Sequence, residues 1–219
     1  MRHTDVREAL QRPDVRHPDV RHPDVRDATP RANVVLGDLR MRPYGVADRD
    51  RLRRMSTVLS PQSLYTRFFA GTPQIPEMYV RALHALDHWN HDALVAMIDD
   101  EMVGIAEYVR DRADPERAEI AVLIADHWQR HGVASCLIRY LARLAERRGI
   151  TEFSADVMLG NAAALAAIRA GWPAARPQRD GGAARFRLPL PQPGSGRGER
   201  SRDHEGIELV LELLGSQSR

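Results

Sequence analysis

Apolar and polar residues recur along the chain with two different periods, which separate predicted strands from predicted helices. Short apolar or alternating runs predict strands over residues 35–44, 93–98, 102–110, 117–124, 153–158 and 183–190. Apolar residues at helical spacing predict helices over residues 47–59, 61–69, 76–86, 133–148 and 161–170. The resulting order, β-α-α-α-β-β-β-α-β-α-β, predicts a mixed α/β domain over residues 34–190, the size of one ordinary hydrophobic core.

Capping and turn residues mark the ends of several of these elements. Ser60 precedes Pro61 in the pattern of an N-cap followed by proline at the first helical position. The polar segment 99–101 separates two apolar runs and predicts a β-hairpin. Gly149 ends the long helix that begins near Val133. These local signals agree with the elements that the periodicity predicts.

The two ends of the chain lack the pattern of a folded domain. Residues 1–33 contain a repeat of the type His-Pro-Asp-Val-Arg, in which proline interrupts helices and the single valine is too little to build a core. We predict an extended or disordered arm there, with a docking tail or a histidine-based metal site as functional alternatives. Residues 191–219 predict a linker and C-terminal tail, within which residues 207–214 fit a helix or a strand.

Composition excludes several classes of protein. The 219 residues are 43% hydrophobic and 28% charged, as in globular domains, and no apolar run is long enough to span a membrane. The N-terminal residues have no apolar signal-peptide core, so we expect a cytoplasmic protein. Cys136 has no second cysteine to pair with and no neighbouring ligand at metal spacing, so neither a disulfide nor a metal site is expected.

All basic side chains are arginine. There are 32 of them against 30 acidic residues, which gives a net charge of +2, and lysine does not occur. A genome rich in GC favours arginine codons, which is a sufficient explanation for this bias. The arginines alternate with Asp and Glu instead of forming a basic stripe, and this counts against a nucleic-acid-binding function.

A short motif at the start of the long helix carries the clearest candidate chemistry. Gln129, Gly132 and Ala134 follow a buried strand in the pattern Q-x-x-G-x-A. Backbone NH groups at a helix N-terminus lack internal partners and lie at the positive end of the helix dipole, so they bind anions. The motif therefore predicts a cradle for a pyrophosphate, with a structural turn as the alternative. It has neither the lysine of a P-loop nor the three glycines of a dinucleotide fingerprint.

Several features together resemble the GNAT superfamily of acyl-CoA N-acyltransferases over roughly residues 36–190. They are the element order, the motif after the fourth strand, and Asn161 followed by Gly171 and Trp172. The resemblance implies a mixed, mostly antiparallel central sheet with flanking helices. It also implies acetyl-CoA as the cosubstrate and no metal.

Two further segments narrow the resemblance. Residues 59–69 and 117–122 resemble the bacterial protein-lysine acetyltransferase branch. This implies an amine acceptor, with a protein lysine as the first hypothesis and a small-molecule amine as the alternative. A non-catalytic acyl-CoA sensor or interaction module is the competing interpretation. Since the chain contains no lysine, it has no lysine side chain of its own to acetylate.

The resemblance also assigns contacts with acetyl-CoA. In the family the fourth strand splays from the fifth, and its exposed backbone pairs with the pantetheine amides. The residues implied at this edge are Val122, Leu123 and Ile124. The residues implied around the pyrophosphate are Gln129, Arg130, His131, Gly132, Val133, Ala134 and Ser135. Asn161 is a further implied contact, with an N-cap of the last helix as its alternative role.

Glu119 is the outstanding candidate for the general base. It lies in an otherwise apolar strand on the face opposite Ile120 and Val122, where burial is expected to raise its pKa toward the working range. The alternative is a solvated residue at the start of a strand, paired with an arginine, and Glu107 on the preceding strand is the reserve base. A backbone NH near Val122 or Leu123 is expected to stabilise the oxyanion.

The chain departs from the family pattern at the general acid. Many members carry a tyrosine on the last helix that protonates the leaving thiolate. Alignment from Asn161 places Ile168 there, and alignment back from Gly171 places Ala167. We therefore expect that water serves as the acid or that no acid is used.

Other polar residues lie where the family builds its acceptor site. They are Tyr65, Arg67, Asp87, His88 and His91. From the sequence, Tyr65 and Phe68 are expected to pack in the second helix, and Arg67 is expected to be a solvated charge. The loop 87–91 is expected to be exposed.

Overall fold

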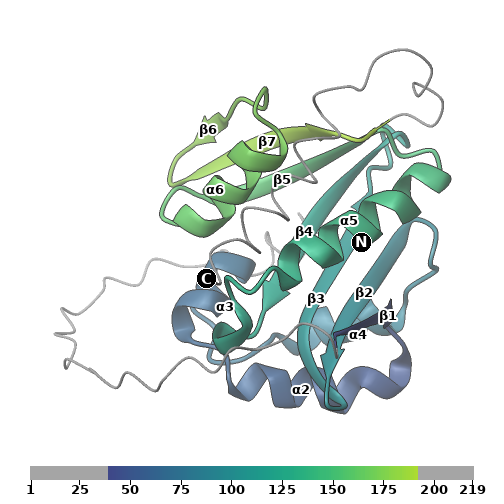
Figure 1. The fold of residues 1–219 in the computed structure, drawn as a ribbon, viewed down its shortest axis with the longest axis vertical. Coiled ribbons are helices and arrows are strands. Elements are labelled where there is room, and N and C mark those ends of the chain that lie inside the picture. The colour runs from purple at the N-terminus through teal and green to yellow at the C-terminus, as the bar shows by residue number, and fades with distance from the viewer. Residues whose placement is uncertain (1–38, 192–219) are drawn as a thin grey trace, which may run out of the picture.

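The computed structural model describes residues 39–191, which form one sheet with helices on both faces (Figure 1). The strands are β1 (Arg40–Pro43), β2 (His91–Ile98), β3 (Glu101–Arg110), β4 (Arg117–Ile124), β5 (Glu152–Met158), β6 (Gln178–Asp180) and β7 (Ala183–Pro189). The α-helices are α2 (Arg49–Thr57), α3 (Pro61–Phe68), α4 (Glu77–His84), α5 (Val133–Arg147) and α6 (Ala162–Gly171). Two 3-10 turns, η2 (Val46–Asp48) and η3 (Asp126–Trp128), precede α2 and α5.

The sheet is mixed and mostly antiparallel, as the sequence predicts. Its strand order is β1-β2-β3-β4-β5-β7-β6, and β4 with β5 is the parallel pair among antiparallel neighbours. That pair is short, because its register ends where Glu119 lies opposite Ser154. Beyond this point β4 and β5 diverge, so the sheet opens into a fork (Figure 1).

Alternating side chains along the strands supply a core on each face of the sheet. On one face α5 and α6 cover a cluster that includes Ile120, Leu137, Leu141, Phe153 and Ile168. On the other face α2, α3 and α4 cover a cluster that includes Leu52, Leu64, Leu83, Ile105 and Leu123. Within residues 39–191, no helix is both long and apolar enough to cross a bilayer.

The predicted hairpin is confirmed as β2–β3. Asp99 and Asp100 at its tip have positive φ values of 48° and 63°, the geometry of the two-residue turn that matches the twist of paired strands. Asp and Asn adopt this conformation more readily than most residues, because their short polar side chains form local hydrogen bonds. The residues between the two apolar runs therefore fix the register of the hairpin.

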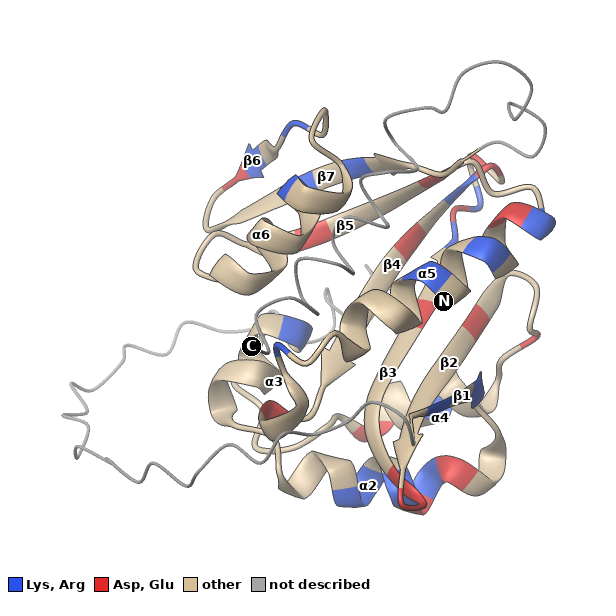
Figure 2. Cartoon of the chain, viewed as in Figure 1, with Lys and Arg blue, Asp and Glu red and all other residues tan. Residues whose placement is uncertain are grey.

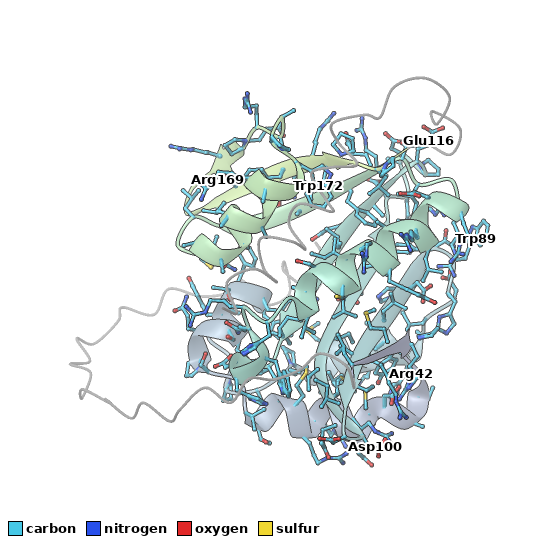
Figure 3. The ribbon with its side chains drawn as sticks, in the orientation of Figure 1. Arg42, Trp89, Asp100, Glu116, Arg169 and Trp172 are labelled. Carbon is cyan, nitrogen blue, oxygen red and sulfur yellow. The ribbon has the colours of Figure 1, made fainter. Side chains whose placement is uncertain are left out.

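Helix α6 begins and ends as its sequence indicates. The Asn161 side chain accepts a hydrogen bond from the Ala164 amide at 3.1 Å, which makes Asn161 the N-cap. At the other end, the indole Nε1 of Trp172 donates to the carbonyl of Pro189 at 2.9 Å and so links the end of α6 to β7 (Figure 3). These bonds fix α6 across the β5–β7 half of the sheet.

Within residues 39–191, the structure adds three elements that the sequence did not predict. They are strand β6 and both 3-10 turns. The first predicted strand, 35–44, is described only from Arg40 onward. The predicted arm (1–33) and most of the predicted linker and tail (191–219) lie outside the described residues.

Candidate functional site

The fork between β4 and β5 leaves one backbone edge of β4 without a partner strand. Pairing with β5 ends at Glu119, but β4 continues to Ile124, and its other edge remains paired with β3 up to the Ile124–Gly104 position. Val122, Leu123 and Ile124 lie on this open stretch, as predicted for the pantetheine edge. An extended polar chain can add to such an edge through main-chain hydrogen bonds.

The loop before α5 presents backbone amides beside the same opening. Cys136 is the first helical residue whose amide bonds back, to the Gly132 carbonyl at 3.1 Å. The amides of Val133, Ala134 and Ser135 precede that bond and lie at the positive end of a helix of 15 residues. Gly132 has a φ of 83°, a conformation that a side chain would strain.

Three other residues of the predicted pyrophosphate segment, Gln129, Arg130 and His131, shape the turn before α5. Arg130 is exposed and has a φ of 64°, which helps to turn the chain into α5. His131 is half-buried, and its Nδ1 lies 2.9 Å from the Gln129 carbonyl. The Gln129 side chain points away from the loop amides and toward α3, where its amide nitrogen donates to the hydroxyl of Ser63 at 2.9 Å. Its backbone NH donates to the Asp126 carbonyl at 3.2 Å, so the donors of Gln129 are engaged within the turn and with α3.

Glu119 lies at the point where the fork begins. It is half-buried, and its neighbours across the sheet are Val109 on β3 and Ser154 on β5. The adjacent residues Ala118 and Ile120 are buried under α5, so Glu119 projects from the opposite face, as predicted. That places a carboxylate beside the open edge of β4, at the closed end of the fork.

An ion pair on β5 and β7 shares this face with Glu119. Arg185 donates two hydrogen bonds of 2.8 Å to the two carboxylate oxygens of Asp156. These bonds raise the pKa of Arg185, and the negative charge of Glu119 raises it further. Figure 2 shows acidic and basic positions side by side along β4, β5 and β7. The sequence did not single out this pair, because Asp156 and Arg185 become neighbours only through the strand register.

Glu107, the reserve base, is held in a buried cluster on β3, the strand that pairs with the edge of β4 away from the fork. It is 1% exposed, and its two carboxylate oxygens contact the guanidinium of Arg67 and, at 2.8 Å, Nε2 of His91. Arg67 also lies over the rings of Phe68 and Tyr79, 4.9 and 5.0 Å from their centres. Burial, with the charge of Glu107 second, raises the pKa of Tyr79. Both Glu107 oxygens are engaged inside the fold, which disfavours Glu107 as the reserve base.

Two expectations for α3 are wrong, and both have the same cause. Arg67 is only 8% exposed and Tyr65 is 41% exposed, the reverse of the predicted arrangement. Leu64 and Phe68 occupy the core face of α3, and at about 100° per residue Tyr65 and Arg67 flank that face at equal angles, so helical spacing alone does not decide which of them is buried. Arg67 lies next to Phe68 on the sheet side, where it meets Glu107.

The loop before β2 is exposed as predicted, apart from its last residue. Residues 87–90 are exposed and His91 is half-buried. The Asp87 carboxylate accepts hydrogen bonds from the amides of Trp89, Asn90 and His91 at 2.7 to 2.9 Å. Burial opposes the charge of Asp87, but these bonds outweigh it and lower the Asp87 pKa.

The helix that carries a tyrosine acid in many family members has no acidic hydroxyl here. Ile168 is buried in the core under α6, and Ala167 is half-buried. The oxygen of Asn161 is engaged in its capping bond, which agrees with the alternative role given above. Among residues 39–191, no group of three or more His, Cys, Asp or Glu side chains has the arrangement of a metal site.

Comparisons with known proteins place this site in context. The model of the acetyltransferase (GNAT) family matches residues 59–172. An acetyltransferase of Pseudomonas aeruginosa is 31% identical over 121 residues, which are 53% of this chain and 64% of that protein. The chain therefore spans less than two thirds of that relative's length.

Solved structures give the same result. The GNAT domain of S. lividans PAT is 30% identical and superposes with a TM-score of 0.64 over 69% of this chain and 90% of that domain. The putative acetyltransferase yncA from Salmonella typhimurium, solved with acetyl-CoA, is 16% identical with a TM-score of 0.57, over 74% of this chain and all of that one. The second likeness concerns the fold alone.

Proposed function

Because the chain belongs to the acetyltransferase (GNAT) family, we propose that it transfers the acetyl group of acetyl-CoA to an amine, with a protein lysine as the acceptor and Glu119 as the base. One observation carries this proposal. The open edge of β4, the amides at the start of α5 and the Glu119 carboxylate meet at the same fork in the sheet.

The cosubstrate would lie along the fork. Val122, Leu123 and Ile124 offer main-chain groups to the pantetheine amides, in the manner of an added strand. The amides of residues 130–135 offer donors to the pyrophosphate at the N-terminus of α5. Asn161 uses its side-chain oxygen as a cap, so a contact with acetyl-CoA would come from its side-chain amide nitrogen.

The reaction needs two protons removed from the nitrogen, one before and one after it attacks, and one developing charge stabilised. The acceptor ammonium gives a proton to the Glu119 carboxylate, directly or through one water, and the neutral amine attacks the thioester carbonyl carbon. A backbone NH near Val122 or Leu123 stabilises the oxyanion that forms. As the C–S bond breaks, the nitrogen gives its second proton to water and the CoA thiolate takes a proton from water, since Ile168 and Ala167 have no proton to give.

Two features support a lysine acceptor. Residues 59–69 and 117–122, which resemble the protein-lysine branch, contribute to α3 and β4 at this site. Glu119 places a carboxylate on the face from which an ammonium would approach, beside the ion pair of Asp156 with Arg185. The chain has no lysine of its own, so any lysine acceptor belongs to another chain. A small-molecule amine is the alternative acceptor, and the missing tyrosine favours the acyl-CoA sensor as the alternative function.

The test pairs binding with turnover. Acetyl-CoA binding is measured by calorimetry, and thioester consumption is measured with lysine peptides and with small amines. Binding with turnover on lysine peptides supports the proposal. Turnover on small amines alone would make a small-molecule amine the acceptor in place of a protein lysine. Stoichiometric binding without turnover on any amine favours the acyl-CoA sensor.

The Glu119→Gln variant tests the assignment of the base. We expect it to lower kcat by about a hundredfold or more, because a positioned general base contributes roughly 10²–10⁴ to the rate. The dissociation constant of acetyl-CoA should stay within about twofold, since the backbone contacts are untouched. Glu116→Gln is the matched control, because Glu116 is exposed and lies in the loop just before β4. A variant with wild-type kcat would remove Glu119 from the mechanism.

A further inference from the structure

Asp126 lies in η3, between the end of β4 and the loop before α5, and it binds α3. One oxygen of its carboxylate accepts the backbone NH of Ser60 at 2.8 Å, and the other accepts the hydroxyl of Ser63 at 2.5 Å. These partners are more than 60 residues away in the sequence, at the N-terminus of α3. Hydrogen bonds to a carboxylate are shorter and stronger than bonds between neutral groups, so Asp126 holds this helix end firmly.

Gln129 extends the same cluster to the cosubstrate side. Its amide nitrogen lies 2.9 Å from the Ser63 hydroxyl, 3.1 Å from the Asp126 carboxylate and 3.2 Å from the carbonyl of Ile124. Ile124 is the last residue of the open β4 edge, and Gln129 directly precedes the amides at the start of α5. The cluster therefore touches both parts of the proposed acetyl-CoA site.

Helix α3 lies on the acceptor side of β4. Leu64 and Phe68 of α3 share a core cluster with Leu123, and Leu123 is on the same face of β4 as Glu119. Tyr65 projects from α3 into solvent. A rigid α3 thus presents a fixed surface next to the face on which the proposed base lies.

We propose that Asp126 is a positioning residue that links the acetyl-CoA loop to α3, so that a bound cosubstrate holds α3 in place for the acceptor. This inference rests on the proposed function. The residues that form the link are Ser60, Ser63, Asp126 and Gln129. A ligand that orders one side of such a link lowers the cost of ordering the other side, which couples the two substrates.

Hydrogen exchange on the full chain tests the link without any turnover. In the wild type, acetyl-CoA should slow amide exchange in residues 129–137 and also in residues 60–68. In Asp126→Ala, acetyl-CoA should protect residues 129–137 alone. The link would be overturned if acetyl-CoA did not protect residues 60–68 in the wild type. It would also be overturned if acetyl-CoA still protected these residues in Asp126→Ala. If acetyl-CoA fails to bind the wild type, the proposed function falls and this inference falls with it.

Steady-state kinetics supply a second test. Asp126→Ala should raise the KM for the acceptor by about tenfold, the equivalent of one to two lost hydrogen bonds, while the acetyl-CoA dissociation constant changes less than about threefold. Asp126→Asn keeps one accepting oxygen, so its acceptor KM should lie between the values of the wild type and of Asp126→Ala. Ser63→Ala should shift the KM in the same direction as Asp126→Ala.

The control and the folding readout keep this test decisive. Asp50→Ala is the matched control, because Asp50 is an exposed carboxylate on α2 whose ion pair with Arg53 is 4.0 Å long, and its KM should match the wild type. Thermal melting is measured for every variant. An unchanged acceptor KM in Asp126→Ala, or equal losses for acceptor and acetyl-CoA in step with the melting temperature, would show that Asp126 only supports the fold.

Discussion

Tyr44 shows how a single buried hydroxyl sets a local energetic cost. Its side chain is 2% exposed, and among the described residues its hydroxyl has no hydrogen-bond partner. Burial, with the charge of Asp48 second, raises the Tyr44 pKa to about 12. A buried polar group without a partner costs free energy on folding, so the hydroxyl itself does not stabilise the fold.

We therefore expect Tyr44→Phe to be as stable as the wild type at pH 7, or more stable by up to about 1 kcal/mol. The pKa is higher in the folded state than the ordinary value of 10.0, so the neutral phenol favours folding below pH 10. That contribution is lost as the pH rises from 10 to about 12, and the phenylalanine variant should lack this loss. Urea unfolding at pH 7 and pH 11 measures both effects, and Tyr140→Phe at an exposed position is the control. Equal alkaline losses in Tyr44→Phe and the wild type would contradict the assignment.

Single residues also mark the limit of what the sequence can predict about the site. The position of Glu119 on its face of β4 followed from strand alternation. The roles of Arg67 and Tyr65 did not follow, because α3 has polar residues on either side of its two core positions. Which of them turns inward depends on Glu107, which is 40 residues away and becomes a neighbour only in the folded sheet.

At the scale of elements, the ion pair between Arg67 and Glu107 joins α3 to β3 inside the core. Removal of one partner from a buried pair leaves the other charge without compensation. We expect Glu107→Ala to lower the free energy of unfolding by about 3–5 kcal/mol. The control is Glu101→Ala at the exposed pair with Arg54, which should cost about 1 kcal/mol or less. Urea unfolding measures both variants.

A double variant makes this prediction sharper. Arg67→Met combined with Glu107→Leu removes both charges and keeps most of the apolar volume. It should recover much of the stability that Glu107→Ala loses, since replacement of a buried pair by apolar residues is often neutral. A double variant as unstable as the sum of the separate Arg67→Met and Glu107→Leu losses would show that the two charges are not coupled, which would contradict the ion pair as the link between α3 and β3.

The elements with an apolar period were predicted, and those without one were not. The five α-helices and the hairpin follow from periodicity and caps. Strand β6 is exposed at all three of its residues, so no apolar pattern marks it, and it forms because β7 offers a free edge. The fork was expected from the family resemblance alone, since the apolar run of β4 continues to Ile124 without any sign that pairing with β5 ends at Glu119.

At the scale of the whole molecule, the two halves of the sheet are joined by few backbone bonds and by one large core. Only the Arg117–Glu119 stretch of β4 pairs with β5. The cluster under α5 and α6 crosses that junction, because it contains residues from β2, β3, β4, β5 and β7. This shared core keeps Glu119 and the loop amides in a fixed relation.

This arrangement predicts that residues 34–190 are sufficient for folding and for acetyl-CoA binding. Both core clusters consist of residues between 39 and 190, and so do all the contacts proposed for acetyl-CoA. We expect a chain of residues 34–190 to melt within about 4 °C of the full chain, a shift equivalent to roughly 1 kcal/mol for a domain of this size, and to bind acetyl-CoA within about twofold. Calorimetry and thermal melting on both chains measure these quantities. A truncated chain that folds but binds at least tenfold more weakly would place a binding contact outside the domain, and one that does not fold would show that the two clusters are not sufficient.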